Sequence, residues 1–100
     1  MPSGDTVRVK WLSAATRNLD AAMEYIARED PDVANEMYAY IRERVAVLGK
    51  HPEMGRPGRV FGTRELVIEK YPYIVPYRVR ENEVQVLRVF HTSQKPPSKW

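Results

Sequence analysis

The sequence has 100 residues, a length that fits one domain with a single modest core. Its hydrophobic fraction of 43% and charged fraction of 29% are ordinary for a globular protein, and the lack of cysteine excludes disulfides and thiolate-bound metal. No apolar run approaches the roughly 18 residues of a membrane span, and no secretory pattern opens the chain, so we expect a cytoplasmic protein with no membrane partner.

The net charge of +3 is unevenly distributed along the chain. Residues 1–49 carry six Lys or Arg and eight Asp or Glu, whereas residues 50–100 carry ten basic and five acidic side chains. A basic half of a small domain indicates an anionic partner such as nucleic acid, the ribosome or an acidic peptide. A globular protein whose charge is simply uneven is the alternative interpretation.

The first half of the chain predicts a strand and two helices. Thr6–Leu12 alternates apolar and basic residues, which is typical of a half-buried strand. Ser13 stands at the N-cap position of a first helix over about Ala14–Arg28. Its apolar residues recur at helical spacing: Ala15, Leu19, Ala22, Met23 and Ile26.

A second helix follows immediately. Asp30 is its expected N-cap, Pro31 suits its first position, and Gly49 is expected to end it in a left-handed conformation. Its apolar stripe consists of Ala34, Met37, Ile41, Val45 and Leu48. The short connection predicts that the two helices form an antiparallel hairpin.

The second half begins with a turn-rich stretch, His51–Gly62, and continues with three short strands. Pro76 lies inside the second strand and predicts an edge position or a bulge, because proline cannot donate to a ladder. The expected strands are Arg64–Glu69, Tyr73–Arg80 and Glu83–His91, with a turn at Glu81-Asn82.

These elements predict an α+β fold in which an N-terminal strand precedes an antiparallel two-helix hairpin, and the hairpin packs on a mainly antiparallel four-stranded sheet. The whole chain, residues 1–100, is expected to form one domain. Residues 1–5 and 93–100 are expected to be flexible tails.

Three arginines cluster around the glycine-rich connection. Arg56, Arg59 and Arg64 could grip a phosphate, since glycine permits close approach and guanidinium binds phosphate with two donors. A solvated loop is the alternative.

A second set lies in the last hairpin. Depending on strand register, Arg78 could lie near Arg88 or near His91. A histidine beside an arginine could cleave RNA without metal, because the histidine moves a proton and the arginine stabilises the phosphate. The alternative is that His91 only ends a strand and hydrogen-bonds the backbone. Two histidines forty residues apart do not indicate a metal site, and we expect neither metal nor cofactor.

Helix two also offers a candidate protein interface. Tyr38 and Tyr40 cannot both lie on the buried stripe, because residues two apart point in different directions. An exposed tyrosine beside Met37 or Ile41 would suit a partner protein.

The order of elements and several strings resemble the RelE/ParE toxin family of toxin–antitoxin, or plasmid stabilisation, systems over nearly the whole chain. The strings are Trp11-Leu12-Ser13-Ala14-Ala15, Leu19-Asp20, Tyr25-Ile26-Ala27, His51-Pro52-Glu53-Met54-Gly55, Gly62-Thr63-Arg64-Glu65-Leu66, Tyr77-Arg78-Val79 and Leu87-Arg88-Val89-Phe90-His91-Thr92. The resemblance rests on their order and spacing, since no string is specific alone.

The resemblance implies a growth-arresting toxin that a cognate antitoxin neutralises, with the antitoxin's flexible tail wrapping the toxin. Met37, Tyr38 and Ile41 are the expected antitoxin contacts. Arg56, Arg59 and Arg88 are the expected contacts to nucleic acid or target.

The family has two activities, and the resemblance leaves both open. One branch inhibits DNA gyrase; the other is a ribosome-dependent mRNA endonuclease, for which Arg64, Arg78 and His91 would be the catalytic set. The loop after helix two lacks closely spaced lysines, and Thr92 stands where a catalytic tyrosine could follow. These departures favour the ParE side, and therefore a gyrase inhibitor rather than an enzyme.

Overall fold

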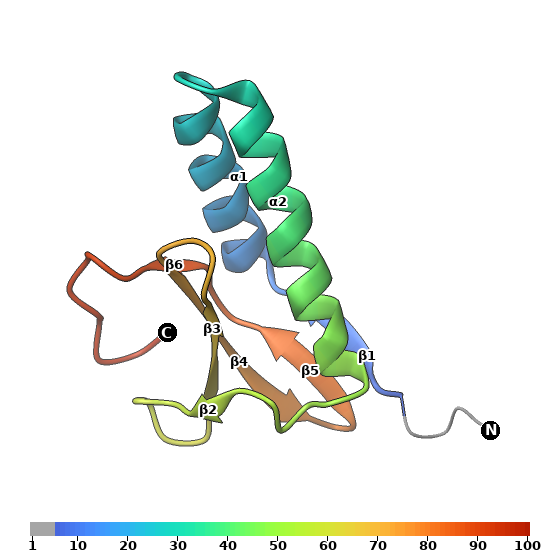
Figure 1. The fold of residues 1–100 in the computed structure, drawn as a ribbon. Helices are drawn as coiled ribbons and strands as arrows, with labels where there is room; N and C mark the ends of the chain where they lie inside the picture. The colour runs from blue at the N-terminus through green and yellow to red at the C-terminus, as the bar shows by residue number, and fades with distance from the viewer. Residues whose placement is uncertain (1–5) are drawn as a thin grey trace.

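The computed structural model describes residues 6–100; the expected flexible segment at residues 1–5 lies outside this range. Two helices, a short 3₁₀ turn and six strands follow one another (Figure 1). Their bounds are β1 (Arg8–Trp11), α1 (Ser13–Ala27), α2 (Pro31–Ala46), η2 (Val47–Gly49), β2 (Arg56–Pro57), β3 (Arg64–Ile68), β4 (Tyr73–Arg80), β5 (Glu83–Val86) and β6 (Phe90–His91).

The strands form one mixed sheet in the order β1-β5-β4-β3-β2, and β6 pairs with β4. The pair β1–β5 is parallel and the other pairs are antiparallel. The α1–α2 hairpin packs on one face of this sheet, and its connecting turn projects beyond the sheet (Figure 1). The predicted α+β class and the helical hairpin are therefore confirmed. One short strand, β2, adds to the predicted pattern, and the predicted strand Glu83–His91 is divided into β5 and β6.

The core lies between the hairpin and the sheet. The predicted stripe of the second helix is buried throughout, with Met37 at 1% exposure and Ile41 at 0%. It packs against the helix-facing residues of the sheet, which are Leu66, Ile68, Tyr73, Val75, Tyr77, Val84, Val86 and Val89. Burial of this apolar surface is the main force that holds the hairpin on the sheet.

The helix ends follow the prediction only in part. The Asp30 side chain accepts a hydrogen bond from the Val33 amide at 3.2 Å, so the predicted N-cap of α2 is confirmed. The predicted cap of α1 is wrong: Ser13 is already helical, Leu12 occupies the N-cap, and no side chain caps the helix.

Within residues 6–100, no helix combines the length and apolarity needed to cross a membrane.

Gly49 was expected to be left-handed, but it lies in η2 with no positive φ. Its carbonyl accepts a hydrogen bond from the Val7 amide at 2.8 Å. A Cβ at this position would lie 3.0 Å from the Val7 carbonyl oxygen. The glycine is therefore needed for the close approach of β1 and not for a helix-ending conformation.

The third predicted strand, Glu83–His91, is interrupted. Tyr77 pairs with Val86, and Ile74 pairs with Phe90. Between these two pairs β4 has two residues, 75–76, whereas the partner segment has three, 87–89. Residues 87–89 form a bulge at the position of Pro76, and the Pro76 carbonyl accepts a hydrogen bond from the Leu87 amide at 2.9 Å. The bulge predicted from this proline is confirmed, whereas a continuous strand is wrong.

Tyr77 connects the sheet to the loop that precedes it. Its hydroxyl donates to the Pro52 carbonyl at 2.6 Å and accepts from the Gly55 amide at 2.8 Å. The side chain is 0% exposed, the bond to Gly55 is buried and the bond to Pro52 is partly buried. This contact fixes the loop between η2 and β2 on the helix-facing side of the sheet.

We expect Tyr77→Phe to lower the free energy of unfolding by roughly 2 kcal/mol, because it leaves a buried amide and a buried carbonyl without their partner. Urea denaturation followed by circular dichroism measures this change. Tyr25→Phe is the matched control, since the Tyr25 side chain is 67% exposed and its hydroxyl is solvated. Equal stability of both variants would contradict this account of the loop.

Burial raises the pKa of Tyr77 above its usual value of 10.0, and it raises the pKa of Tyr73 in the same way. Below about pH 10 both tyrosines are protonated in the folded and unfolded states, so their full contribution to the free energy of unfolding is present. Above that pH the unfolded chain loses these protons first, so stability falls as the pH rises through the raised folded pKa. Unfolding free energies measured between about pH 9 and pH 11 should fall less steeply in Tyr73→Phe than in the parent.

Candidate functional site

The bulge decides which face each residue after Val86 occupies. Val86 and Val89 are 0% and 6% exposed and both belong to the helix-facing core, although they are three positions apart. The Val89 amide donates to the Asn18 side chain of α1 at 3.2 Å, which satisfies the donor that the bulge frees. An unbroken strand Glu83–His91 would place Val86 and Val89 on opposite faces, so simple alternation fails beyond Val86.

Arg64 holds the preceding loop in place. It pairs with Tyr77, so it lies on the helix-facing side of the sheet. Its Nη1 donates to the Gly55 carbonyl at 2.7 Å and to the Glu53 carbonyl at 3.3 Å. These bonds use the guanidinium for loop carbonyls rather than for an external phosphate.

Arg78 lies on the opposite face, which no helix covers and which we call the open face. It pairs with Gln85, and its Nε donates to the Gln85 Oε1 at 2.8 Å. Neither of the two registers expected for the last hairpin is realised, because neither Arg88 nor His91 lies opposite Arg78.

His91 pairs with Tyr73 and lies on the helix-facing side. The two rings meet edge-on with centroids 5.1 Å apart, and Nδ1 accepts a hydrogen bond from the Ser93 amide at 3.1 Å. Its partner Tyr73 lies five positions before Arg78 in β4, roughly 17 Å along the strand. The structure therefore brings Arg64, Arg78 and His91 to three separate places.

His91 and Tyr73 instead line a groove of about 540 Å³ between α1 and the end of the sheet. The helix contributes small residues to this groove, Ala21 and Ala22, together with the exposed Tyr25. The groove is open and partly apolar, which suits a segment of another protein.

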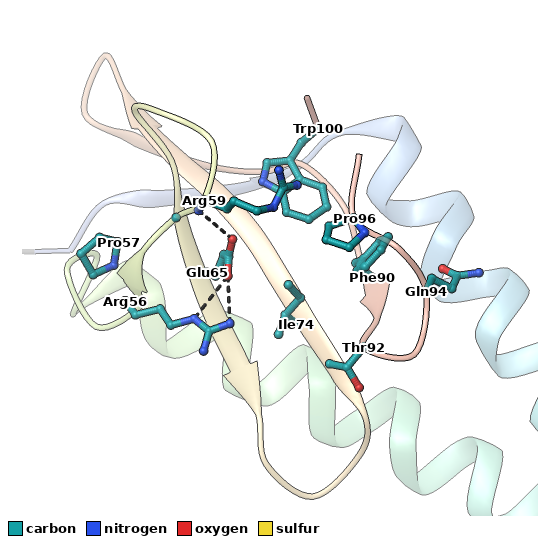
Figure 2. A pocket seen from close by; sticks show the side chains of 11 residues that line it. Arg56, Pro57, Arg59, Glu65, Ile74, Phe90, Thr92, Gln94, Pro96 and Trp100 are labelled. Atoms are coloured by element: carbon teal, nitrogen blue, oxygen red, sulfur yellow. Dashed lines mark hydrogen bonds and ion pairs between the residues drawn. The ribbon is translucent and has the colours of Figure 1, made fainter. Parts of the chain in front are cut away.

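Arg56 and Arg59 meet at a buried carboxylate that is not among the predicted site residues. Glu65 is 5% exposed and lies on the open face of β3 (Figure 2). It accepts hydrogen bonds from Arg56 Nε and Nη2 at 3.2 and 3.0 Å, and from the Arg59 amide at 3.0 Å. The sequence could have indicated this role, because Glu65 is an acidic residue within a predicted strand and a buried carboxylate needs a basic partner.

The C-terminal segment, expected to be a flexible tail, lies over the open face. Trp100 packs edge-on against Phe90 with centroids 5.3 Å apart, and the Arg59 guanidinium lies over its indole at 5.2 Å. Arg59 also donates to the Pro97 carbonyl, and Arg88 Nε donates to the Trp100 carbonyl at 2.8 Å. Arg59 and Arg88, two of the arginines expected to contact a target, therefore bond this segment, and the third, Arg56, lines the same pocket as Arg59 (Figure 2).

A pocket of about 420 Å³ lies beneath this segment, and Figure 2 shows the side chains that line it. Its floor is apolar, with Ile74 and Phe90, and Arg56 and Arg59 stand at one side. Glu65 accepts from the Arg56 guanidinium and from the Arg59 amide at this side of the pocket.

The expected antitoxin contacts lie mostly inside the protein. Met37 and Ile41 face the sheet, where a partner does not reach them. Tyr38 keeps accessible surface and stacks under the Arg42 guanidinium at 5.6 Å.

Among residues 6–100, no three His, Asp or Glu side chains are grouped closely enough to hold a metal ion.

The fold and these surfaces define a class: a small helical hairpin on a mixed sheet, with a groove on one side and an arginine-rich open face on the other. Residues 9–96 match the model of the ParE toxin of the type II toxin–antitoxin system parDE. The chain belongs to the ParE toxin family.

Two curated relatives agree with this assignment. A protein of Sinorhizobium fredii named toxin Y4kP is 43% identical over 90 residues, which cover 90% of this chain and 93% of the relative. Toxin RelE2 of Caulobacter vibrioides is 30% identical over 87 residues, which cover 87% of this chain and 97% of the relative.

Solved structures show the same fold. A chain of the chromosomal ParDE toxin–antitoxin system of P. aeruginosa superposes with a TM-score of 0.80 and 32% identity, covering 88% of this chain and 98% of the other. A chain of the RelBE2 toxin–antitoxin complex of Mycobacterium tuberculosis has a TM-score of 0.58 and 23% identity, covering 86% and 98%. The second likeness concerns the fold alone.

We expect Glu65→Gln to lower the free energy of unfolding by roughly 1–2 kcal/mol, because the amide keeps the shape but weakens the charge-assisted bond to Arg56, whose side chain is 58% exposed. Chemical denaturation measures the effect. Glu69→Gln, on an exposed residue just after the same strand, is the matched control. Parent-like stability of Glu65→Gln would show that the carboxylate has no structural role.

Proposed function

We propose that this protein inhibits DNA gyrase as a ParE-type toxin, and that a cognate antitoxin neutralises it by binding. Both gyrase and ribosomes are cytoplasmic, so the protein is proposed to act there. The observation that carries the proposal is the separation of Arg64, Arg78 and His91 over two faces of the sheet.

An RNA endonuclease that works without metal needs its proton-transfer group and its phosphate-stabilising group within hydrogen-bond reach of one phosphate. Nη1 of Arg64 donates to loop carbonyls, and His91 lies on the other side of the sheet from Arg78. An inhibitor that acts by binding requires only a surface of the right shape and charge. The geometry therefore supports the gyrase alternative over the mRNA endonuclease.

The proposed antitoxin site is the groove beside α1. The family model describes a toxin–antitoxin system, and the relative at 32% identity comes from a ParDE system, which supports an antitoxin partner here. The groove offers the exposed ring of Tyr25 and the small side chains Ala21 and Ala22, against which a helix can pack closely. Tyr38 is the accessible member of the set expected from the sequence and remains a second proposed contact.

The purified chain should inhibit supercoiling of a relaxed plasmid by gyrase in a dose-dependent manner, and added antitoxin should restore supercoiling. Transcript mapping after induced expression runs in parallel. Gyrase that stays fully active at a large excess of toxin would contradict the proposal, as would new transcript ends that appear on induction.

His91→Ala separates the two activities. We expect it to arrest growth as the parent does, because the imidazole makes only local contacts with Tyr73 and Ser93. A colony-forming assay after induction measures this, with circular dichroism as the check that the variant folds. Loss of toxicity in a folded variant, together with loss of transcript cleavage, would instead support the endonuclease.

A further inference from the structure

A second basic surface lies on the open face, away from the C-terminal segment. Its position follows from strand register: Arg8 and Arg80 both lie opposite Glu83. In the next row Lys10 and Arg78 both lie opposite Gln85. We call these four basic residues the basic patch: Arg8, Lys10, Arg78 and Arg80.

A chain of hydrogen bonds joins part of the patch. Arg78 Nε donates to Gln85 Oε1 at 2.8 Å, and Gln85 Nε2 donates to Glu83 Oε1 at 3.0 Å. Arg8 Nε lies 3.6 Å from the other oxygen of Glu83. Within the two rows Glu83 is the only acid, so four cations face one carboxylate. Among the described residues, neither Lys10 nor Arg80 forms an ion pair.

The chemistry of the patch matches a sugar–phosphate backbone. The two basic residues of each strand are two positions apart, about 7 Å, and the two strands lie about 10 Å apart across β5. Arg8, Lys10 and Arg80 are exposed, so their charges can reach several phosphates of one ligand. None of the four lines the pocket beneath the C-terminal segment or the groove beside α1, so an apolar peptide side chain finds no anchor here.

The patch contains no aromatic ring. Phe90 and Trp100 lie elsewhere on the open face and pack against each other. Single strands are held largely by stacking of bases on aromatic side chains, whereas a duplex keeps its bases stacked inside and presents its phosphates along the outside. A surface of cations without aromatic rings therefore favours duplex over single strand.

We propose that the basic patch binds the backbone of duplex DNA without sequence preference. The biological setting of this inference rests on the proposed function, because gyrase acts on duplex DNA. An inhibitor that also contacts the DNA would be held at the enzyme–DNA complex.

The test is fluorescence anisotropy of the full-length chain with a labelled duplex of about 20 base pairs, the corresponding single strand, and a labelled polyglutamate peptide. Four phosphate contacts predict a slope of about −3.6 for the logarithm of the association constant against the logarithm of salt concentration. Affinity for the duplex should therefore fall roughly 100-fold between 50 and 200 mM salt.

The double variant Lys10→Gln/Arg80→Gln should reduce the magnitude of this slope by about 1.8, since two contacts are lost. The matched control is Arg17→Gln/Arg28→Gln, which removes the same charge from exposed positions at α1. The control should bind like the parent, because charges beyond about 10 Å are screened.

Three outcomes would overturn the inference: no binding of duplex at 50 mM salt, equal loss in both double variants, or tighter binding of the single strand or of polyglutamate. The assay contains no gyrase, so its failure leaves gyrase inhibition untouched. Conversely, DNA binding by a chain that fails to inhibit supercoiling would refute the proposed function and not this one.

Discussion

Pro76 imposes the constraint on which the rest of the sheet depends. It lies in the middle of β4, the strand that pairs with β3, β5 and β6, and it has no amide hydrogen to donate. The partner segment bulges at this point, and the side chain of Asn18 takes up the amide of Val89. One extra residue reverses the side on which every following side chain lies. The bulge therefore sets the positions of Phe90 and His91, and with them the character of both faces.

The two faces have different physical properties. The helix-facing side is largely covered by the hairpin and has a groove beside α1, where Tyr25 and His91 keep accessible surface. The open face carries a buried carboxylate, Glu65, that organises two arginines, and the C-terminal segment packs on Phe90 through Trp100. Two macromolecules could therefore bind on opposite sides of one small domain without competing.

This division gives the proposed activities a common structural basis. An antitoxin in the groove and a DNA duplex on the basic patch would be kept apart by the sheet itself. Gyrase inhibition would then depend on surface charge and shape, and no proton transfer would be required. The ordered arginines around Trp100 and the basic patch around Gln85 are separate features, because the bonds of one do not involve the other.

Much of the fold could be predicted from the sequence, because the relevant interactions are local. The stripe from Ala34 to Leu48, the cap at Asp30 and the alternation in β4 depend on helical or strand periodicity alone. Resemblance to the toxin family also followed from the order of short strings.

The candidate site depended on contacts between distant segments, and these the sequence did not determine. Glu65 acquires its role from Arg56 and Arg59 across a turn. Arg8 and Lys10 join Arg78 and Arg80 because a parallel strand inserts beside β5. Periodicity determines which way a side chain points within its own element, whereas register, bulges and strand order determine its neighbours. Only the tertiary structure could decide that His91 and Arg78 lie on opposite faces.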